Sequence, residues 1–443
     1  MRIFLLRHFL VLFAGIISLG FMAMPTFAQD ADKMHDMQRV IDAQQKHLEV
    51  QQKQLDEQRQ LLQDLQKQME SLARKEETKE IPAVAQKPAA TPTAKTAITS
   101  DNVVTSDVDR VKLSISGWVN PAVNVVDDGK DTNAYFVDND NAESRVHFAG
   151  TGKINDDLTL GAVIELSIAP NRAGFVSQND PNPGDVFEQR ITEATLDSKR
   201  FGELSLGRGF TASYHTAGSD LSKTLMISYN NVSDLAGGML FRQKSDDSLT
   251  DLDIAHSFIS FDGLGRQSRV RYDTPTFNGF TFATSLLTDQ RYDGAARWSG
   301  QGYGFKSAVS AGVADPKIND DTNLIYSGSF ALLHENTGLN FTFAAGMLDQ
   351  DNRSNRRNYY GKLGWITNFF SVGETAFAVD YSRTEYQPAE SDQGYSTSLA
   401  GVQYFEKYGV AAYLIYRKYS LDLTAEPEVH DINVMSGGAM VMF

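Results

Sequence analysis

Basic side chains alternate with apolar ones in three short segments of this chain. Such a period of two is typical of a β-strand, in which successive side chains point to opposite faces. If the apolar residues Val146, Val270 and Trp298 face lipid, the basic residues face the other way. Those basic residues are Arg145, His147, Arg269, Arg271, Arg297 and Lys306. Guanidinium groups stay charged and can hold a carboxylate with two hydrogen bonds, so this strip predicts a site that favours small anions.

Carboxylates on the same face could neutralise these arginines. Glu165 shares the period of two in the segment 158–168, and Glu374 and Asp380 fall in later segments of the same kind. An internal salt bridge to one of them explains each arginine as well as contact with a solute does. The sequence alone leaves both explanations open.

The elements that must position these residues are β-strands. From Arg110 to Phe443 we count about sixteen alternating segments of about 8 to 14 residues. A soluble sandwich alternates too, but the small polar residues on the second face favour a wet interior and an apolar exterior in lipid. The sequence therefore predicts an all-β fold, a 16-stranded antiparallel transmembrane β-barrel over residues 110–443.

Short and long connections alternate between the predicted strands. Bacterial barrels have short periplasmic turns and longer outer loops, so both ends of the barrel are expected on the periplasmic side. The longer connections are predicted at 125–143, 169–188, 385–393 and 422–429. One connection, about 210–266, is far longer than a hairpin requires, and loops of this length are usually functional.

Composition excludes several other classes of function. The chain has 443 residues, no cysteine, 41% hydrophobic residues and a formal net charge of −15. The lack of cysteine excludes disulfide scaffolds, thiolate zinc sites and cysteine nucleophiles. The acidic balance argues against nucleic-acid binding, and no Asp/Asn spacing completes a calcium loop. We therefore expect no cofactor, no metal site and no nucleic-acid partner.

The N-terminal residues follow other patterns. Residues 1–28 combine early arginines, an apolar core and a small-residue cleavage site, which predicts a signal peptide; an uncleaved anchor is the alternative. Residues 29–76 repeat apolar residues at heptad spacing from Met34 to Leu72. The heptads predict an α-helical coiled-coil stalk and a homo-oligomer, with a solitary amphipathic helix as the alternative. Residues 77–109, rich in Pro and Ala, predict a linker.

Short motifs add a family resemblance. FGELSLGRG at 201–209 before the long connection, RYDTPTFNGF at 271–280 and the terminal Phe443 resemble trimeric outer-membrane porins. With the signal, stalk and linker, their order is similar to the DcaP-like porins, although Val441 stands where many porins carry an aromatic residue. The resemblance implies a passive channel for small hydrophilic solutes, favouring anions such as dicarboxylates. It also implies that the long loop folds back and narrows the channel.

The same resemblance implies which residues line the narrow section. Porins of this type carry arginines on the wall opposite the folded loop. By motif position the matching residues are Arg145 and Arg190, followed by Arg266, Arg269 or Arg271. The candidates on the loop itself are Asp220, Asp234 and Arg242. If Arg190 faces inward, Glu193 faces lipid or a neighbouring subunit, unless the strand contains a bulge.

The resemblance also implies location and partners. We expect the outer membrane of a Gram-negative bacterium, with the stalk in the periplasm. Expected partners are further copies in a homotrimer held by barrel wall and coiled coil, outer-membrane lipid and lipopolysaccharide, and small anionic solutes; contact with peptidoglycan is left open. We expect no enzymatic activity, because no His has a Ser and an acid at suitable spacing. A tether or adhesin is the alternative, but it would not need a long folded loop.

Overall fold

A computed structural model describes residues 104–108, 111–318, 322–425 and 427–443. The chain divides into two compact units, Met1–Thr91 and Pro92–Phe443, and every described residue belongs to the second. The predicted signal peptide, coiled coil and most of the predicted linker lie outside the described residues.

The described residues form mainly antiparallel β-strands. The strands are β1 (Val104–Val108), β2 (Val111–Val119), β3 (Pro121–Asp127), β4 (Thr132–Asp138), β5 (Arg145–Lys153), β6 (Leu158–Pro170), β7 (Asp185–Ser198), β8 (Gly202–Phe210), β9 (Leu240–Arg242), β10 (Leu249–Asp253), β11 (Arg266–Asp273), β12 (Phe280–Leu287), β13 (Tyr292–Gly302), β14 (Phe305–Ala314), β15 (Thr322–His334), β16 (Leu339–Gln350), β17 (Arg356–Phe370), β18 (Gly373–Glu385), β19 (Gln393–Phe405), β20 (Val410–Asp422) and β21 (Ile432–Met442). The short helices are η1 (Asp140–Ala142), η2 (Val232–Leu235), α2 (Ile254–Ser257), η3 (Thr288–Gln290) and η4 (Glu406–Tyr408). Among these described helices, none is long and apolar enough to cross a membrane.

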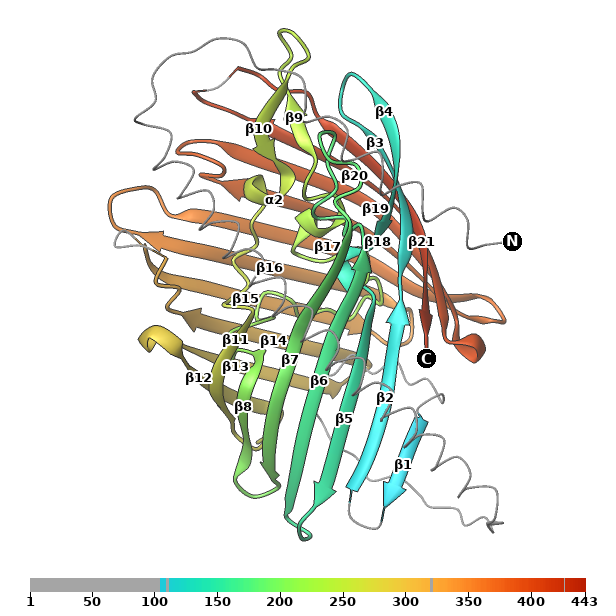
Figure 1. Cartoon of the computed structure of the whole chain (residues 1–443), viewed down its shortest axis with the longest axis vertical. Helices are drawn as coiled ribbons and strands as arrows, with labels where there is room; N and C mark the ends of the chain where they lie inside the picture. The colour runs from blue at the N-terminus through green and yellow to red at the C-terminus, as the bar shows by residue number, and fades with distance from the viewer. Residues whose placement is uncertain (1–103, 109–110, 319–321, 426) are drawn as a thin grey trace, which may run out of the picture. The chain divides into compact units, whose positions relative to one another are not determined.

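Sixteen strand positions close into one antiparallel barrel (Figure 1). β2 and β3 act as one strand interrupted at Asn120, and β4 and β5 act as the next, interrupted around η1. β21 closes the ring because it pairs with β2 at Trp118 and Val119 and with β3 from Ala122 to Asp127. The predicted 16-stranded antiparallel β-barrel is confirmed. β1, which falls in the predicted linker, adds a short extra strand along β2.

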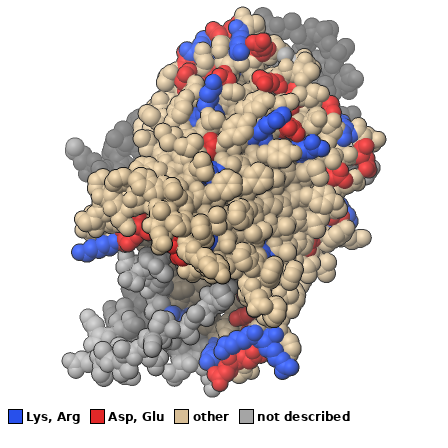
Figure 2. All heavy atoms as spheres, turned by 180° about the vertical axis from the view of Figure 1, so that it is seen from behind, with Lys and Arg blue, Asp and Glu red and all other residues tan. Residues whose placement is uncertain are grey.

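Large apolar side chains cover the outer face of the barrel. Leu363, Val379 and Leu399 are 65%, 55% and 60% exposed, and the register places them side by side on β17, β18 and β19. Tyr416 and Met435 continue this row onto β20 and β21. Figure 2 shows a broad zone of one outer face with almost no charged side chains, flanked by charged side chains toward both ends. Such a belt suits the hydrocarbon of a bilayer.

An arginine placed in this belt is expected to destabilise the barrel strongly. Leu399→Arg should lower the free energy of unfolding by about 2 to 4 kcal/mol, because a guanidinium would lie in hydrocarbon. Urea unfolding of the protein folded into lipid vesicles, followed by tryptophan fluorescence, measures the loss. Tyr303→Arg, at a fully exposed turn residue (103%), is the control and should change the free energy by less than about 0.5 kcal/mol. Equal losses for both variants would contradict a lipid-facing belt.

One predicted connection, 125–143, is wrong. β3 and β4 instead form a hairpin whose strands pair from Pro121–Asp138 to Asp127–Thr132. Tyr135 and Val137 are buried in the same apolar cluster as Val232 and Leu235, which come from a distant part of the chain. This long-range packing stabilises a strand that the local sequence pattern does not indicate.

Candidate functional site

Residues 211–265, which connect β8 to β11, lie along the inner face of the barrel wall and are called the inner segment below (Figure 1). Near its start the Ser213 hydroxyl donates to Asp293 Oδ2 on β13 at 2.6 Å. A few residues later the Ser329 hydroxyl on β15 donates to the carbonyl of Thr216, also at 2.6 Å. The first part of the inner segment is therefore fixed to both β13 and β15.

The middle of the inner segment is held by buried charges. Asp220 forms an ion pair with Lys362 on β17, whose side chain has no exposed surface. The Ser228 hydroxyl donates to Asp380 on β18 at 2.6 Å, and Asp380 accepts two bonds from Arg417 on β20 at 2.9 and 2.6 Å. Buried carboxylates and cations of this kind are stable only when paired. Asp220, a predicted constriction residue, is thus an anchor between the segment and the wall.

The inner segment continues across the barrel to β3. The Tyr419 hydroxyl on β20 donates to the carbonyl of Val232 at 2.6 Å, and the Asn124 amide on β3 donates to the carbonyl of Leu235 at 2.7 Å. Its hydrogen bonds thus run from β13 to β20 and on to β3, along one side of the interior. The basic residues predicted from the sequence concentrate on other strands.

Glu165 on β6 is the centre of a charged group on the interior face. Arg145 Nη1, His147 Nδ1 and Arg190 Nε lie 3.3, 3.4 and 2.6 Å from its carboxylate oxygens. Glu143 pairs with Arg190 as well, and its carboxylate lies 3.8 Å from Arg145. Four predicted site residues, Arg145, His147, Glu165 and Arg190, are therefore brought together. The salt-bridge explanation holds for both arginines, because each has carboxylate partners.

A β-bulge explains the orientation of Arg190. The register of β6 and β7 shifts after the pair Glu165–Ile191, which leaves Arg190 as the extra residue. As a result Arg190 and Glu193 both face the interior, where Arg190 binds Glu165 and Glu193 binds Arg269 on β11. Of the two explanations that the sequence left open, the bulge alone accounts for both side chains.

The next basic residues along the wall are also bound within the protein. Arg271 holds Asp273 with two hydrogen bonds of 2.7 Å. Arg297 on β13 donates to the carbonyls of Ala212 and Tyr214 at 2.7 and 2.9 Å. Both arginines donate hydrogen bonds to backbone carbonyls at the start of the inner segment and so help to position it.

Two further predicted residues lie apart from this group. Arg242 on β9 binds Asp128 at 2.8 Å and so joins the inner segment to the β3–β4 turn. Lys306, beside the β13–β14 turn, forms an exposed pair with Glu335 at 3.0 Å. Neither residue has a contact with the group around Glu165, and we assign no constriction role to either.

Arg266, at the start of β11, differs from Arg145, Arg190, Arg269 and Arg271, each of which pairs with a carboxylate. Its guanidinium lies over the Phe210 ring, 5.8 Å from the ring centroid. The Tyr214 ring stacks on the same Phe210 ring, with the two centroids 4.5 Å apart. Among the described residues no carboxylate forms an ion pair with Arg266, and its Nε has no hydrogen-bond partner. The guanidinium charge of Arg266 therefore has no ion-pair partner within the described residues, although its Nε is buried.

Asp234, on η2 of the inner segment, faces these arginines. Its carboxyl accepts a hydrogen bond from the Tyr229 hydroxyl. Burial, reinforced by the charge of Asp140, raises the pKa of Asp234 to about 8, although Arg172 and Arg266 are close enough to oppose the shift. At neutral pH this carboxyl is mostly protonated. Asp234 is the predicted loop residue that the structure brings to the arginines.

Three residues of the site were not predicted. Arg172 lies 2.6 Å from Asp140 and 3.3 Å from Glu143, and Tyr214 and Tyr229 come from the inner segment. All lie in or beside connections, where no period of two indicates the direction of a side chain. The loop composition contained no signal that could have identified them. Arg145, Arg172, Arg190 and Arg266 are called the basic cluster below.

The fold and the site together define a class of protein. A closed barrel with an apolar outer belt and a charged interior, narrowed by a long inward segment, is a transmembrane diffusion channel. Among the described residues, no group of three or more His, Asp or Glu side chains is arranged to hold a metal ion.

The chain belongs to the Gram-negative porin family, whose model matches residues 83–423. It is therefore an outer-membrane channel, and family and fold point to transport rather than enzymatic activity. No curated protein sequence matches the chain.

Several solved structures have a similar fold. The anion-selective porin from Comamonas acidovorans matches with a TM-score of 0.52 and 14% identity over 75% of this chain and 100% of that one. In-vitro folded OmpT of Vibrio cholerae matches with a TM-score of 0.50 and 13% identity over 76% and 99%. The DcaP channel of Acinetobacter baumannii matches with a TM-score of 0.48 and 12% identity over 75% and 98%. At such identities the likeness shows the fold alone.

Proposed function

We propose that this porin favours small anions and that dicarboxylates are its natural class of solute. The observation that carries the proposal is Arg266, a guanidinium of the basic cluster without a carboxylate partner among the described residues. The facing carboxyl of Asp234 is mostly neutral at pH 7 because burial raises its pKa to about 8. Arg266 therefore offers a positive charge that no ion pair within the described residues offsets, and such a charge attracts anions and repels cations.

The preference for dicarboxylates follows from the spacing of charge in the basic cluster. Arg266 acts electrostatically on Arg145 and on Glu165, and it acts together with Arg190 on Tyr214, so the three guanidiniums share one electrostatic environment. A solute with two carboxylates can engage Arg266 with one and compete for a neighbouring arginine with the other. A monovalent anion gains only the first contact.

Planar-bilayer recordings test this proposal. The reversal potential in a KCl gradient should show anion preference, and succinate added in millimolar amounts should reduce the single-channel chloride current more than equal concentrations of acetate. Acetate controls for carboxylate chemistry with a single charge. A clear cation preference would overturn the anion proposal, and equal effects of succinate and acetate would overturn the dicarboxylate part.

Anion preference is expected to fall as pH rises from 6 to 9. The raised pKa means that Asp234 is neutral below about pH 8 and negative above it, so deprotonation adds a negative charge facing Arg172 and Arg266. Asp140, Tyr214, Tyr229 and Tyr419 are further ionisable groups that interact with it. Reversal potentials measured at several pH values should show a step near pH 8 that Asp234→Asn removes. A step of the same size in Asp234→Asn would exclude this carboxyl as its cause.

We also propose a homotrimer joined through the barrel wall and the coiled coil 29–76, with the stalk in the periplasm. Support comes from the heptad repeat of that segment. Light scattering of the detergent-purified full chain should give three copies, and deletion of 29–76 should weaken the trimer. A monomer in both preparations would overturn this part.

A further inference from the structure

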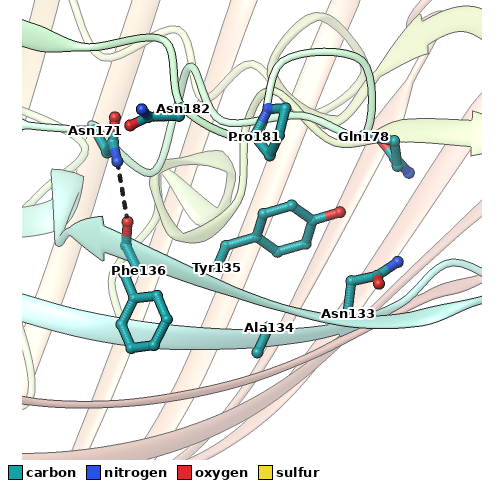
Figure 3. A pocket seen from close by; sticks show the side chains of 8 residues that line it. All are labelled: Asn133, Ala134, Tyr135, Phe136, Asn171, Gln178, Pro181 and Asn182. Carbon is teal, nitrogen blue, oxygen red and sulfur yellow. Dashed lines mark hydrogen bonds between the residues drawn. The ribbon is translucent and has the colours of Figure 1, made fainter.

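A pocket of about 450 Å³ lies between the β4 strand and the connection from β6 to β7 (Figure 3). β4 pairs with β3 along its length, and at Asp138 its other edge is bonded to residues 171–173 of this connection. The pocket lies beside the rest of that edge. The residues that line it are Asn133, Ala134, Tyr135, Phe136, Asn171, Gln178, Pro181 and Asn182. It lies at the end of the barrel that carries the longer connections, away from the short turns.

Two of the lining amides are fixed by the protein itself. The Gln178 amide donates to Asp128 at 3.1 Å and to the carbonyl of Leu240 at 2.9 Å, and its oxygen accepts from the amide of Leu240 at 2.9 Å. Asn171 accepts from the amide of Gly184 at 3.1 Å. These bonds hold the connection over the β4 edge, so the pocket exists before any ligand binds.

Other polar groups of the pocket lack partners. Tyr135 is 7% exposed, yet its hydroxyl makes no hydrogen bond to a described residue. Figure 3 shows its ring beneath Pro181, with the hydroxyl directed along the pocket toward the side of Gln178. The side-chain amides of Asn133 and Asn182 likewise have no partner within the described residues. The Tyr135 hydroxyl is not among the buried atoms that lack a partner, and Asn133 and Asn182 are exposed. All three groups therefore meet solvent in the pocket, where a ligand can reach them.

The chemistry of the lining restricts what that ligand can be. None of the eight residues is charged at neutral pH, whereas the barrel interior is lined with arginines and carboxylates. Amides and a phenol both donate and accept hydrogen bonds, which suits hydroxyl groups. Pro181 and the ring of Tyr135 offer apolar surface for C–H groups, whereas the ring of Phe136 points away from both (Figure 3). An uncharged molecule with many hydroxyls and apolar ring faces has this combination.

We propose that this pocket binds an uncharged saccharide unit. Two sources supply that chemistry at the outer end of an outer-membrane channel: free sugars in the medium and the sugars of outer-leaflet glycolipid. The pocket contains none of the arginines of the basic cluster. The proposal of sugar binding and the proposal of anion selectivity can therefore be tested independently.

Saturation-transfer NMR on the full chain, in a detergent without a sugar headgroup, tests the proposal. The probes are methyl β-D-glucopyranoside, methyl β-D-galactopyranoside and a neutral core oligosaccharide released from lipopolysaccharide. Transfer to at least one probe is expected. Stronger transfer to the core oligosaccharide, with competition against the free glycosides, would assign the glycolipid as the source; the reverse order would assign free sugar.

Variants decide whether the signal comes from this pocket. Tyr135→Phe removes only the hydroxyl and should weaken binding about fivefold, the value of one hydrogen bond; Asn182→Ala should weaken it as well. Tyr303→Phe, at a fully exposed turn residue, is the matched control and should leave it unchanged. Heat-dependent gel mobility confirms that each barrel is folded. No transfer from any probe, or transfer that neither pocket variant reduces, would overturn the proposal.

Discussion

Asp380→Ala is expected to lower the free energy of unfolding by about 3 to 5 kcal/mol, because it would leave a buried guanidinium without a counter-charge. Asp380 is 2% exposed and Arg417 is 1% exposed. Arg417 donates to both carboxylate oxygens, and Ser228 of the inner segment donates to Asp380 at 2.6 Å. The substitution therefore removes an ion pair of the wall and a bond that holds the inner segment.

Urea unfolding in lipid vesicles measures this loss, and the chain provides a matched control. Asp431 and Lys418 form an ion pair at 2.7 Å whose side chains are 42% and 43% exposed. Asp431→Ala removes the same group from an exposed pair, which is worth less than about 1 kcal/mol. Single-channel recordings of Asp380→Ala should show increased current noise, because the inner segment has lost a bond. Equal stability losses for Asp380→Ala and Asp431→Ala would contradict the role of burial.

The barrel strands could be predicted because their signal is local. A strand between lipid and a wet interior must alternate apolar and polar residues, and the segment 158–168 shows this pattern almost to the limits of β6. The β3–β4 hairpin could not be predicted in the same way. Tyr135 and Val137 are buried by residues about a hundred positions away along the chain, and such contacts leave no periodicity in the segment itself.

The site could be predicted only in part, for a related physical reason. Strand residues such as Arg145 and Glu165 have a direction fixed by their neighbours, so their meeting follows from the pattern. Asp220 and Asp234 both lie in the inner segment, where no period applies. Asp220 forms an ion pair with Lys362, 142 positions away, whereas Asp234 interacts with Arg172 and Arg266 of the basic cluster. The choice between these two acids depends on long-range packing, and so does the bulge that turns Arg190 inward.

Arg266→Glu is expected to reduce the permeability to anions about tenfold and to raise the permeability to cations by a similar factor. The substitution changes the local charge by two units at a residue that no described carboxylate neutralises. One unit charge at roughly 6 Å in water is worth about 0.7 kcal/mol, so two give about 1.4 kcal/mol, which corresponds to a factor of about ten. Arg145→Glu should change selectivity less than Arg266→Glu does and should destabilise the barrel more, because Arg145 already has two carboxylate partners.

The reversal potential in a KCl gradient measures this change, with Arg200→Glu as the control. Arg200 lies at the short turn between β7 and β8, where its guanidinium covers only Phe201, so the same charge change occurs at the rim of the barrel. Water and salt screen exposed charges beyond about 8 Å, and the control should leave selectivity almost unchanged. Equal shifts for both variants would mean that total charge, rather than the basic cluster, sets selectivity. An unchanged potential in Arg266→Glu would place the selective section elsewhere in the barrel, because this arginine would then have no influence on passing ions.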